Sequence, residues 1–272
     1  MNRIQNILDK AERDGNVRRV RTMPETSSAT ALAFDAERAM PPAMEPHTPL
    51  VNPPVVGPRV VRGAFDRRLV VAHAAGSPAA EQYRSIRTRI TQSDHGSAVN
   101  VVLLTSPGRG EGKSLTAANL ALTMGQDVQT RVCVVDANLR QPRLHGLFGV
   151  PDAPGLGDVL AGRATLADAL VQFEDQTLVL LPAGQHPSQS AALLGTAAMR
   201  GIIETLRTQF DRVIIDAPAA GPLADVGILA PLVDGILMVV QAGVTTKPAI
   251  QEAVSTLPSE KFLGVVLNGG VA

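Results

Sequence analysis

Short apolar runs that lack polar alternation recur along most of the sequence, and they constrain the fold more than any other feature. Runs of Val, Leu and Ile of this kind are typical of strands in a parallel sheet covered on both faces. They lie at residues 99–104, 132–135, 178–181, 213–215, 236–240 and 262–267. Stretches that favour helices lie at residues 114–124, 197–210, 223–232 and 248–257. This order predicts an α/β fold: a doubly wound, mostly parallel sheet with helices on both faces, and ligands at the carboxyl ends of the strands.

A glycine-rich loop joins the first of these runs to the helical stretch after it, within residues 101–114. Glycines at every second position let successive backbone N–H groups face one anion, and the following helix adds its N-terminal dipole. The pattern is that of a P-loop NTPase, although Pro107 stands where the consensus has Gly. We expect Lys113 to reach the β- and γ-phosphates of ATP and the Ser114 hydroxyl to bind Mg²⁺. The predicted nucleotide-binding residues are Gly108, Arg109, Gly110, Glu111, Gly112, Lys113, Ser114, Leu115 and Asn268.

Two other predicted strands end in an aspartate. Asp136 follows the run at 132–135, and Asp216 follows the run at 213–215. A carboxylate at such a place is costly if it is buried alone, and it is stabilised beside a cation or a hydrogen-bond donor. In a phosphate-loop fold Mg²⁺ is that cation, and one carboxylate normally holds it through water. Together with Ser114, both aspartates are therefore candidate metal-site residues, and the alternative is that either one caps the following helix.

The first 66 residues differ from the rest in composition and in the local structure that they predict. Ile4, Ile7 and Leu8 fall at helical spacing among charged residues, which predicts a short amphipathic helix. Eight prolines then occur between residues 24 and 58, so we expect an extended, mobile linker. The arm is either a tether or a docking helix for a partner. The remaining residues, 67–272, form the predicted P-loop ATP-binding domain.

Charge and composition exclude several classes of protein. The chain has 25 basic and 25 acidic side chains, so no overall positive field attracts nucleic acid or an anionic membrane. Cys133 is the sole cysteine, which excludes a disulfide framework within the chain, and its apolar surroundings predict a buried, inert thiol. No segment approaches the roughly 20 apolar residues of a membrane span. We therefore expect a cytoplasmic protein whose association with the inner membrane depends on a partner.

Further motifs occur in a fixed order along the chain. Glu81, Arg84 and Arg87 have the spacing E-x-x-R-x-x-R, and residues 136–145 carry an acidic motif followed by Arg-x-Pro-x-x-His. With the nucleotide loop and the segments 155–162 and 264–268, this set resembles the bacterial tyrosine kinases of capsule and exopolysaccharide synthesis. The similarity runs from about residue 67 to the end of the chain.

The resemblance implies a role for the charged stripe and a set of partners. In the family, the stripe formed by Glu81, Arg84 and Arg87 docks onto a neighbouring subunit and helps to close a ring. The alternative is a solvated helix face with local ion pairs. The resemblance also implies that the chain acts with a transmembrane polysaccharide chain-length regulator.

The resemblance assigns catalytic roles as well. Lys113 binds the phosphates, and Asp136 acts near the attacking hydroxyl or the metal. Asp216 holds Mg²⁺ through water, and Arg140 is a candidate for stabilising phosphate charge. One departure stands beside these residues: the family usually has Asp where Asn138 stands, and an amide cannot accept a proton or carry charge to the metal.

A second departure concerns the acceptor tyrosine. The family's C-terminal tyrosine cluster is missing, and Tyr83, the only tyrosine, lies within the charged stripe, where we expect it to pack. Three hypotheses remain: a tyrosine kinase that phosphorylates itself or a partner, a nucleotide-binding switch without kinase activity, and a partitioning-type ATPase. The last class carries an extra lysine early in the loop, where this chain has Gly108 followed by Arg109.

Overall fold

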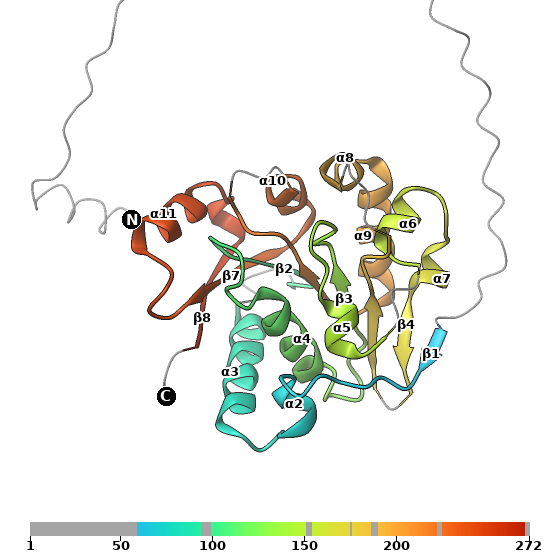
Figure 1. Cartoon of the computed structure of the whole chain (residues 1–272), viewed down its shortest axis with the longest axis horizontal. Helices are drawn as coiled ribbons and strands as arrows, with labels where there is room; N and C mark the ends of the chain where they lie inside the picture. The colour runs from blue at the N-terminus through green and yellow to red at the C-terminus, as the bar shows by residue number, and fades with distance from the viewer. Residues whose placement is uncertain are drawn as a thin grey trace, which may run out of the picture. The chain divides into compact units, whose positions relative to one another are not determined.

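The computed structural model describes residues 59–93, 99–150, 154–174, 176–185, 190–221 and 225–269. The predicted N-terminal helix and nearly all of the predicted linker, residues 1–58, lie outside the described residues. The described residues form the α/β domain shown in Figure 1.

Eight strands of the described residues form one sheet in the order β1-β4-β5-β3-β6-β2-β7-β8. All adjacent strands are parallel except β4 and β5, which are antiparallel. The strands are β1 Arg59–Val61, β2 Val101–Thr105, β3 Val132–Asp136, β4 Val171–Phe173, β5 Leu178–Leu181, β6 Arg212–Asp216, β7 Gly235–Gln241 and β8 Phe262–Asn268. The predicted mostly parallel sheet is confirmed, and each of the six apolar runs corresponds to one of its strands.

Helices cover both faces of this sheet (Figure 1). They are α2 Val70–His73, α3 Pro78–Gln92, α4 Lys113–Met124, α5 Leu144–Phe148, α6 Leu156–Leu160, α7 Leu166–Ala169, α8 Ser190–Leu194, α9 Ala197–Gln209, α10 Asp225–Leu229 and α11 Lys247–Ser255, with 3₁₀ turns at Ala230–Leu232 and Ser259–Lys261. None of the helices in the described ranges is long and apolar enough to cross a membrane.

The core explains why the strands lack polar alternation. In β2, Val101 and Leu103 face a cluster that includes α6, α8, α9, α10 and α11, and Val102 and Leu104 face a cluster with α2, α3, α4 and α5. Every residue of β2 is buried. A strand that is covered on both sides gains burial energy from each apolar side chain, at about 25 cal/mol per Å² of apolar area.

The α/β domain begins before residue 67, where the sequence analysis placed its boundary. Strand β1 pairs with β4 in the sheet, with Arg59 opposite Val171. Phe65 lies edge-on against Phe148 and Phe173, at centroid distances of 5.7 and 5.3 Å. The sequence did not predict β1, because a strand of three residues is too short to show a hydrophobic periodicity.

The strand order brings three functional strand ends together. Strand β6 lies between β3 and β2, and Asp216 at its end is the register partner of both Asp136 and Leu104. Because these strands are parallel, the loop after β2 and the two aspartates emerge at the same edge of the sheet. The predicted meeting of loop and carboxylates is thus a consequence of topology.

Candidate active site

The glycine-rich loop is held in shape by contacts from distant parts of the chain. Gly110 and Gly112 have positive φ values of 79° and 92°, a region that favours glycine. A side chain at Gly112 would place its Cβ 2.1 Å from the Asn268 amide nitrogen. That nitrogen donates a hydrogen bond to the Glu111 carbonyl at 3.0 Å. The end of β8 therefore supports the loop directly.

Glu111 braces the loop from inside. Its carboxylate is buried, and it accepts hydrogen bonds from the Gly108 amide at 2.9 Å and from the Thr245 hydroxyl. Gly108, Glu111 and Asn268 support the loop through these hydrogen bonds and do not line the adjacent pocket, and their predicted contact with nucleotide stays a prediction. The hydrogen bond from Thr245 to Glu111 could not be predicted from the sequence, because the two residues are 134 positions apart and no local motif links them.

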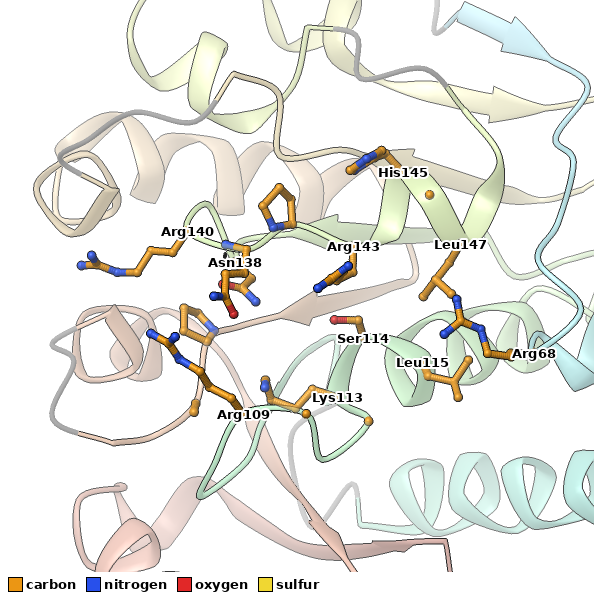
Figure 2. Close-up of a pocket in the computed structure, with 17 residues that line it drawn as sticks. Arg68, Arg109, Lys113, Ser114, Leu115, Asn138, Arg140, Arg143, His145 and Leu147 are labelled. Carbon is orange, nitrogen blue, oxygen red and sulfur yellow. Dashed lines mark hydrogen bonds between the residues drawn. The ribbon is translucent and has the colours of Figure 1, made fainter.

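A pocket of about 560 Å³ opens beside the loop (Figure 2). Six of the predicted nucleotide-binding residues line it, and their contact with nucleotide stays a prediction: Arg109, Gly110, Gly112, Lys113, Ser114 and Leu115. The other charged or titratable side chains of its wall are Arg68, Arg140, Arg143 and His145. None of the described lining residues is acidic. Such a wall suits a polyanion of nucleotide size.

Lys113 begins α4 and is buried within this wall. Burial lowers the pKa of its ammonium, and the charges of Asp216 and Glu111 act in the opposite direction. A buried cation at a helix N-terminus is well placed to hold phosphate oxygens. The predicted position of Lys113 at the phosphate site agrees with this geometry.

Asp136 anchors the loop that follows β3. Its carboxylate accepts hydrogen bonds from the backbone amides of Asn138 at 3.2 Å, Arg143 at 2.9 Å and Leu144 at 3.0 Å. Burial raises the pKa of Asp136, and these three amides lower it. Both oxygens of Asp136 are therefore engaged by backbone amides of the chain itself, and its predicted catalytic and metal-binding roles stay predictions.

Asp216 differs from its neighbour. It is fully buried, and within the described residues neither of its oxygens has a hydrogen-bond partner. Burial raises its pKa, the charge of Asp136 raises it further, and the nearby Ser114 hydroxyl and Lys113 lower it. The Ser114 hydroxyl thus lies close to Asp216 without meeting hydrogen-bond geometry. Buried carboxylate oxygens without partners are rare and suggest a ligand.

These residues fit a magnesium ion bound together with nucleotide. Asp216 and Ser114 offer oxygen ligands, which Mg²⁺ prefers. The described residues contain no group of three His, Cys, Asp or Glu side chains that could hold a metal by themselves. The remaining ligands would therefore come from phosphate oxygens and water, as is usual for this ion in phosphate-loop proteins.

Arg140 is held at the pocket wall by a residue that the sequence analysis did not single out. Its Nε and Nη2 donate to the carboxylate of Asp225 at 2.9 and 3.5 Å. Asp225 begins α10 and is completely buried, and the pairing raises the pKa of the Arg140 guanidinium. Arg140 and Asp225 are 85 positions apart, so their ion pair could not be predicted from sequence spacing.

The relatives of the chain identify its family. No protein-family model matches. The chain is 35% identical to the tyrosine-protein kinase YwqD of Bacillus subtilis over 212 residues, which are 76% of this chain and 89% of that protein. It belongs to the bacterial tyrosine kinase family. The predicted resemblance is therefore confirmed.

Two further similarities agree with this family. The crystal structure of the chimerical protein CapA2B2 matches with a TM-score of 0.72 and 27% identity, covering 80% of this chain and 96% of that one. The succinoglycan biosynthesis transport protein ExoP of Rhizobium meliloti is 34% identical over 204 residues, 73% of this chain and 26% of that protein. A bacterial tyrosine kinase is a nucleotide-binding enzyme, which agrees with the cationic pocket.

The charged stripe of this bacterial tyrosine kinase lies on α3 and has partners inside the chain. Arg84 pairs with Glu81 and donates to the Ala75 carbonyl, and Arg87 donates to the Thr123 carbonyl at 3.0 Å. These contacts hold α3 in place, and they leave Glu81 largely exposed. The subunit-interface role of the stripe stays a prediction.

Tyr83 faces inward from the same helix. It packs against the core cluster that includes α4, and burial raises its pKa. A half-buried phenol that contacts the core is poorly placed to enter an active site. This placement agrees with the expectation that Tyr83 is a packing residue.

Proposed function

We propose that this bacterial tyrosine kinase uses ATP and Mg²⁺ to phosphorylate tyrosine on itself or on a partner, and so regulates exopolysaccharide or capsule synthesis and export. One observation supports this most: Asp216, which is buried and has no hydrogen-bond partner among the described residues, lies near Lys113 and Ser114, and these two residues line a pocket with a cationic wall. A kinase needs that combination, because transfer of a phosphoryl group is catalysed mainly by positioning and by charge stabilisation.

Each residue of the site has a proposed role in binding ATP and Mg²⁺. The amides of the loop and Lys113 hold the β- and γ-phosphates. Ser114 and Asp216 would hold the metal ion, and the bound ion would neutralise phosphate charge. Arg140 adds positive charge to the pocket wall, and Asp136 fixes the loop after β3, which carries Arg140 and Arg143 to that wall.

A partner and a place in the cell complete the proposal. ExoP, a transport protein of succinoglycan biosynthesis, contains a region similar to this chain within a much longer protein. We therefore propose that a transmembrane polysaccharide chain-length regulator recruits the chain to the inner membrane. The stripe of Glu81, Arg84 and Arg87 is the proposed contact between subunits of a ring, and nucleic acid is not a proposed partner.

The test compares native protein with Lys113→Ala by phosphotyrosine mass spectrometry, after incubation with ATP, Mg²⁺ and the cognate membrane partner. Lys247→Ala is the matched control, because Lys247 is an exposed lysine on α11 that does not line the pocket. We expect phosphotyrosine with native protein and with the control, and a loss of at least about 100-fold with Lys113→Ala. Nucleotide binding without any phosphotyrosine in the native protein would rule out the kinase activity.

The loop after β3 favours a second candidate, a nucleotide-binding switch with weak catalysis. Position 138 is an amide whose oxygen accepts a hydrogen bond from the Gln141 amide at 3.3 Å. Asp136 is engaged by three backbone amides. Asn138 has no carboxylate, and the carboxylate of Asp136 is already hydrogen-bonded, so neither side chain is free to accept the proton of an acceptor hydroxyl. Asn138→Asp should raise the rate of phosphotransfer if this amide limits it, and an unchanged rate would place the limitation elsewhere.

A further inference from the structure

Two arginines from one loop line the pocket, and they differ in what they bind. Arg140 is paired with buried Asp225. Both described hydrogen bonds of Arg143 are formed by its backbone, and within the described residues its guanidinium has neither an ion-pair nor a hydrogen-bond partner. Figure 2 shows the Arg143 side chain pointing into the pocket in the region between Asn138 and Ser114, whereas Arg140 points away from Lys113.

The backbone that carries Arg143 is firmly anchored. Its amide donates to Asp136 at 2.9 Å, and the next amide, of Leu144, donates to the same oxygen at 3.0 Å. Asp136 is itself the fully buried last residue of β3. The backbone of Arg143 is therefore fixed relative to the sheet, and a ligand would need to order only the rotamer of the Arg143 side chain.

The position of Arg143 indicates which part of a nucleotide it would meet. The glycine-rich loop and Lys113 line the pocket from between β2 and α4, and Arg143 comes from the loop that follows β3, on the other side of Ser114 (Figure 2). A terminal phosphate bound where these two walls meet would lie next to Ser114, the predicted metal ligand. A guanidinium presents a planar fork of donors that matches phosphate oxygens, and it is strongest when no carboxylate competes for it.

We propose that Arg143 is a catalytic residue that binds the γ-phosphate of ATP and stabilises its charge during transfer. This inference rests on the proposed kinase function. In the transfer, the bond from the γ-phosphorus to the bridging oxygen of ADP breaks and a bond to the tyrosyl oxygen forms. The hydroxyl proton passes to solvent, and ADP leaves. Arg143 keeps its charge throughout and contacts the phosphoryl group on both sides of the step.

The experiment measures dissociation constants for two nucleotides, a non-hydrolysable ATP analogue and ADP, each with Mg²⁺. Arg143→Gln should weaken binding of the ATP analogue about tenfold or more, because a charge-assisted contact is lost. Binding of ADP, which lacks the γ-phosphate, should change less than about twofold. Arg143→Lys should recover part of the loss, since it keeps the charge but not the fork. The matched control is Arg200→Gln, an exposed arginine on α9 outside the pocket, which should change neither constant.

Two results would overturn the assignment. Equal losses for both nucleotides would mean that Arg143 does not read the γ-phosphate, and no loss for either would mean that it does not contact nucleotide. Arg143 is exposed, so the variants should fold, and thermal melting of each variant checks this. A native protein that binds both nucleotides but forms no phosphotyrosine would contradict the kinase proposal alone, because the ratio of the two constants would still test Arg143.

Discussion

Removing Arg140 should destabilise the domain, because it would leave the carboxylate of Asp225 buried without its cation. Loss of one partner from a fully buried ion pair costs about 3–5 kcal/mol. This pair deserves a smaller figure, since the Arg140 side chain is 37% exposed and only one of its two contacts is short, at 2.9 Å. We therefore expect Arg140→Ala to lower the free energy of unfolding by about 2 kcal/mol.

The assay is urea unfolding of three variants at neutral pH. Arg62→Ala is the control, because the Arg62–Glu174 pair has side chains 88% and 40% exposed and should contribute less than about 1 kcal/mol. Adding Asp225→Asn to Arg140→Ala removes the stranded charge, so the double variant should regain roughly half of the lost stability. The reasoning fails if Arg140→Ala costs no more than Arg62→Ala, or if the second substitution only adds to the loss.

Three further predictions follow from single residues. Gly112→Ala should cost about 1–2 kcal/mol of stability and weaken nucleotide binding, because its φ of 92° disfavours a side chain and the new Cβ would meet Asn268; melting and titration with labelled ADP check this. Asn268→Ala removes the hydrogen bond to the loop and should cost about 1 kcal/mol with a several-fold weaker affinity. Burial raises the pKa of the Cys133 thiol far above its usual range, so a thiol reagent at pH 8 should react only after unfolding in urea.

The parts of the fold that the sequence predicted are those with strong periodicity. The apolar runs gave β2, β3, β5, β6, β7 and β8, and the helical stretches gave α4, α9, α10 and α11 to within a few residues. Strands β1 and β4 were missed because each has three residues, which is too short for a hydrophobic pattern to stand out. The antiparallel pairing of β4 with β5 is likewise a tertiary choice that no local pattern specifies.

The parts of the site that the sequence predicted are those fixed by neighbouring residues. A glycine-rich loop between a strand and a helix places Lys113 and Ser114 by local geometry alone, and the structure has them at the pocket. The partners of Glu111 and Arg140 could not be predicted in this way, because Thr245 and Asp225 come from distant positions. Nor does sequence spacing tell which of the two arginines in the loop after β3 pairs with a buried carboxylate and which does not.

The two aspartates at the strand ends show how one edge of a sheet can serve both structure and function. They are register partners, both fully buried, and burial raises the pKa of each. For Asp136, hydrogen bonds from three backbone amides offset the unfavourable burial of the carboxylate. The same hydrogen bonds shape the loop that carries Arg143. The chain supplies no such donor to Asp216 among the described residues. A buried carboxylate left without partners is unfavourable in the free protein, so the partner that satisfies it gains binding energy there. Since Lys113 and Ser114 lie beside Asp216, that partner is best supplied by a metal ion that arrives with the nucleotide.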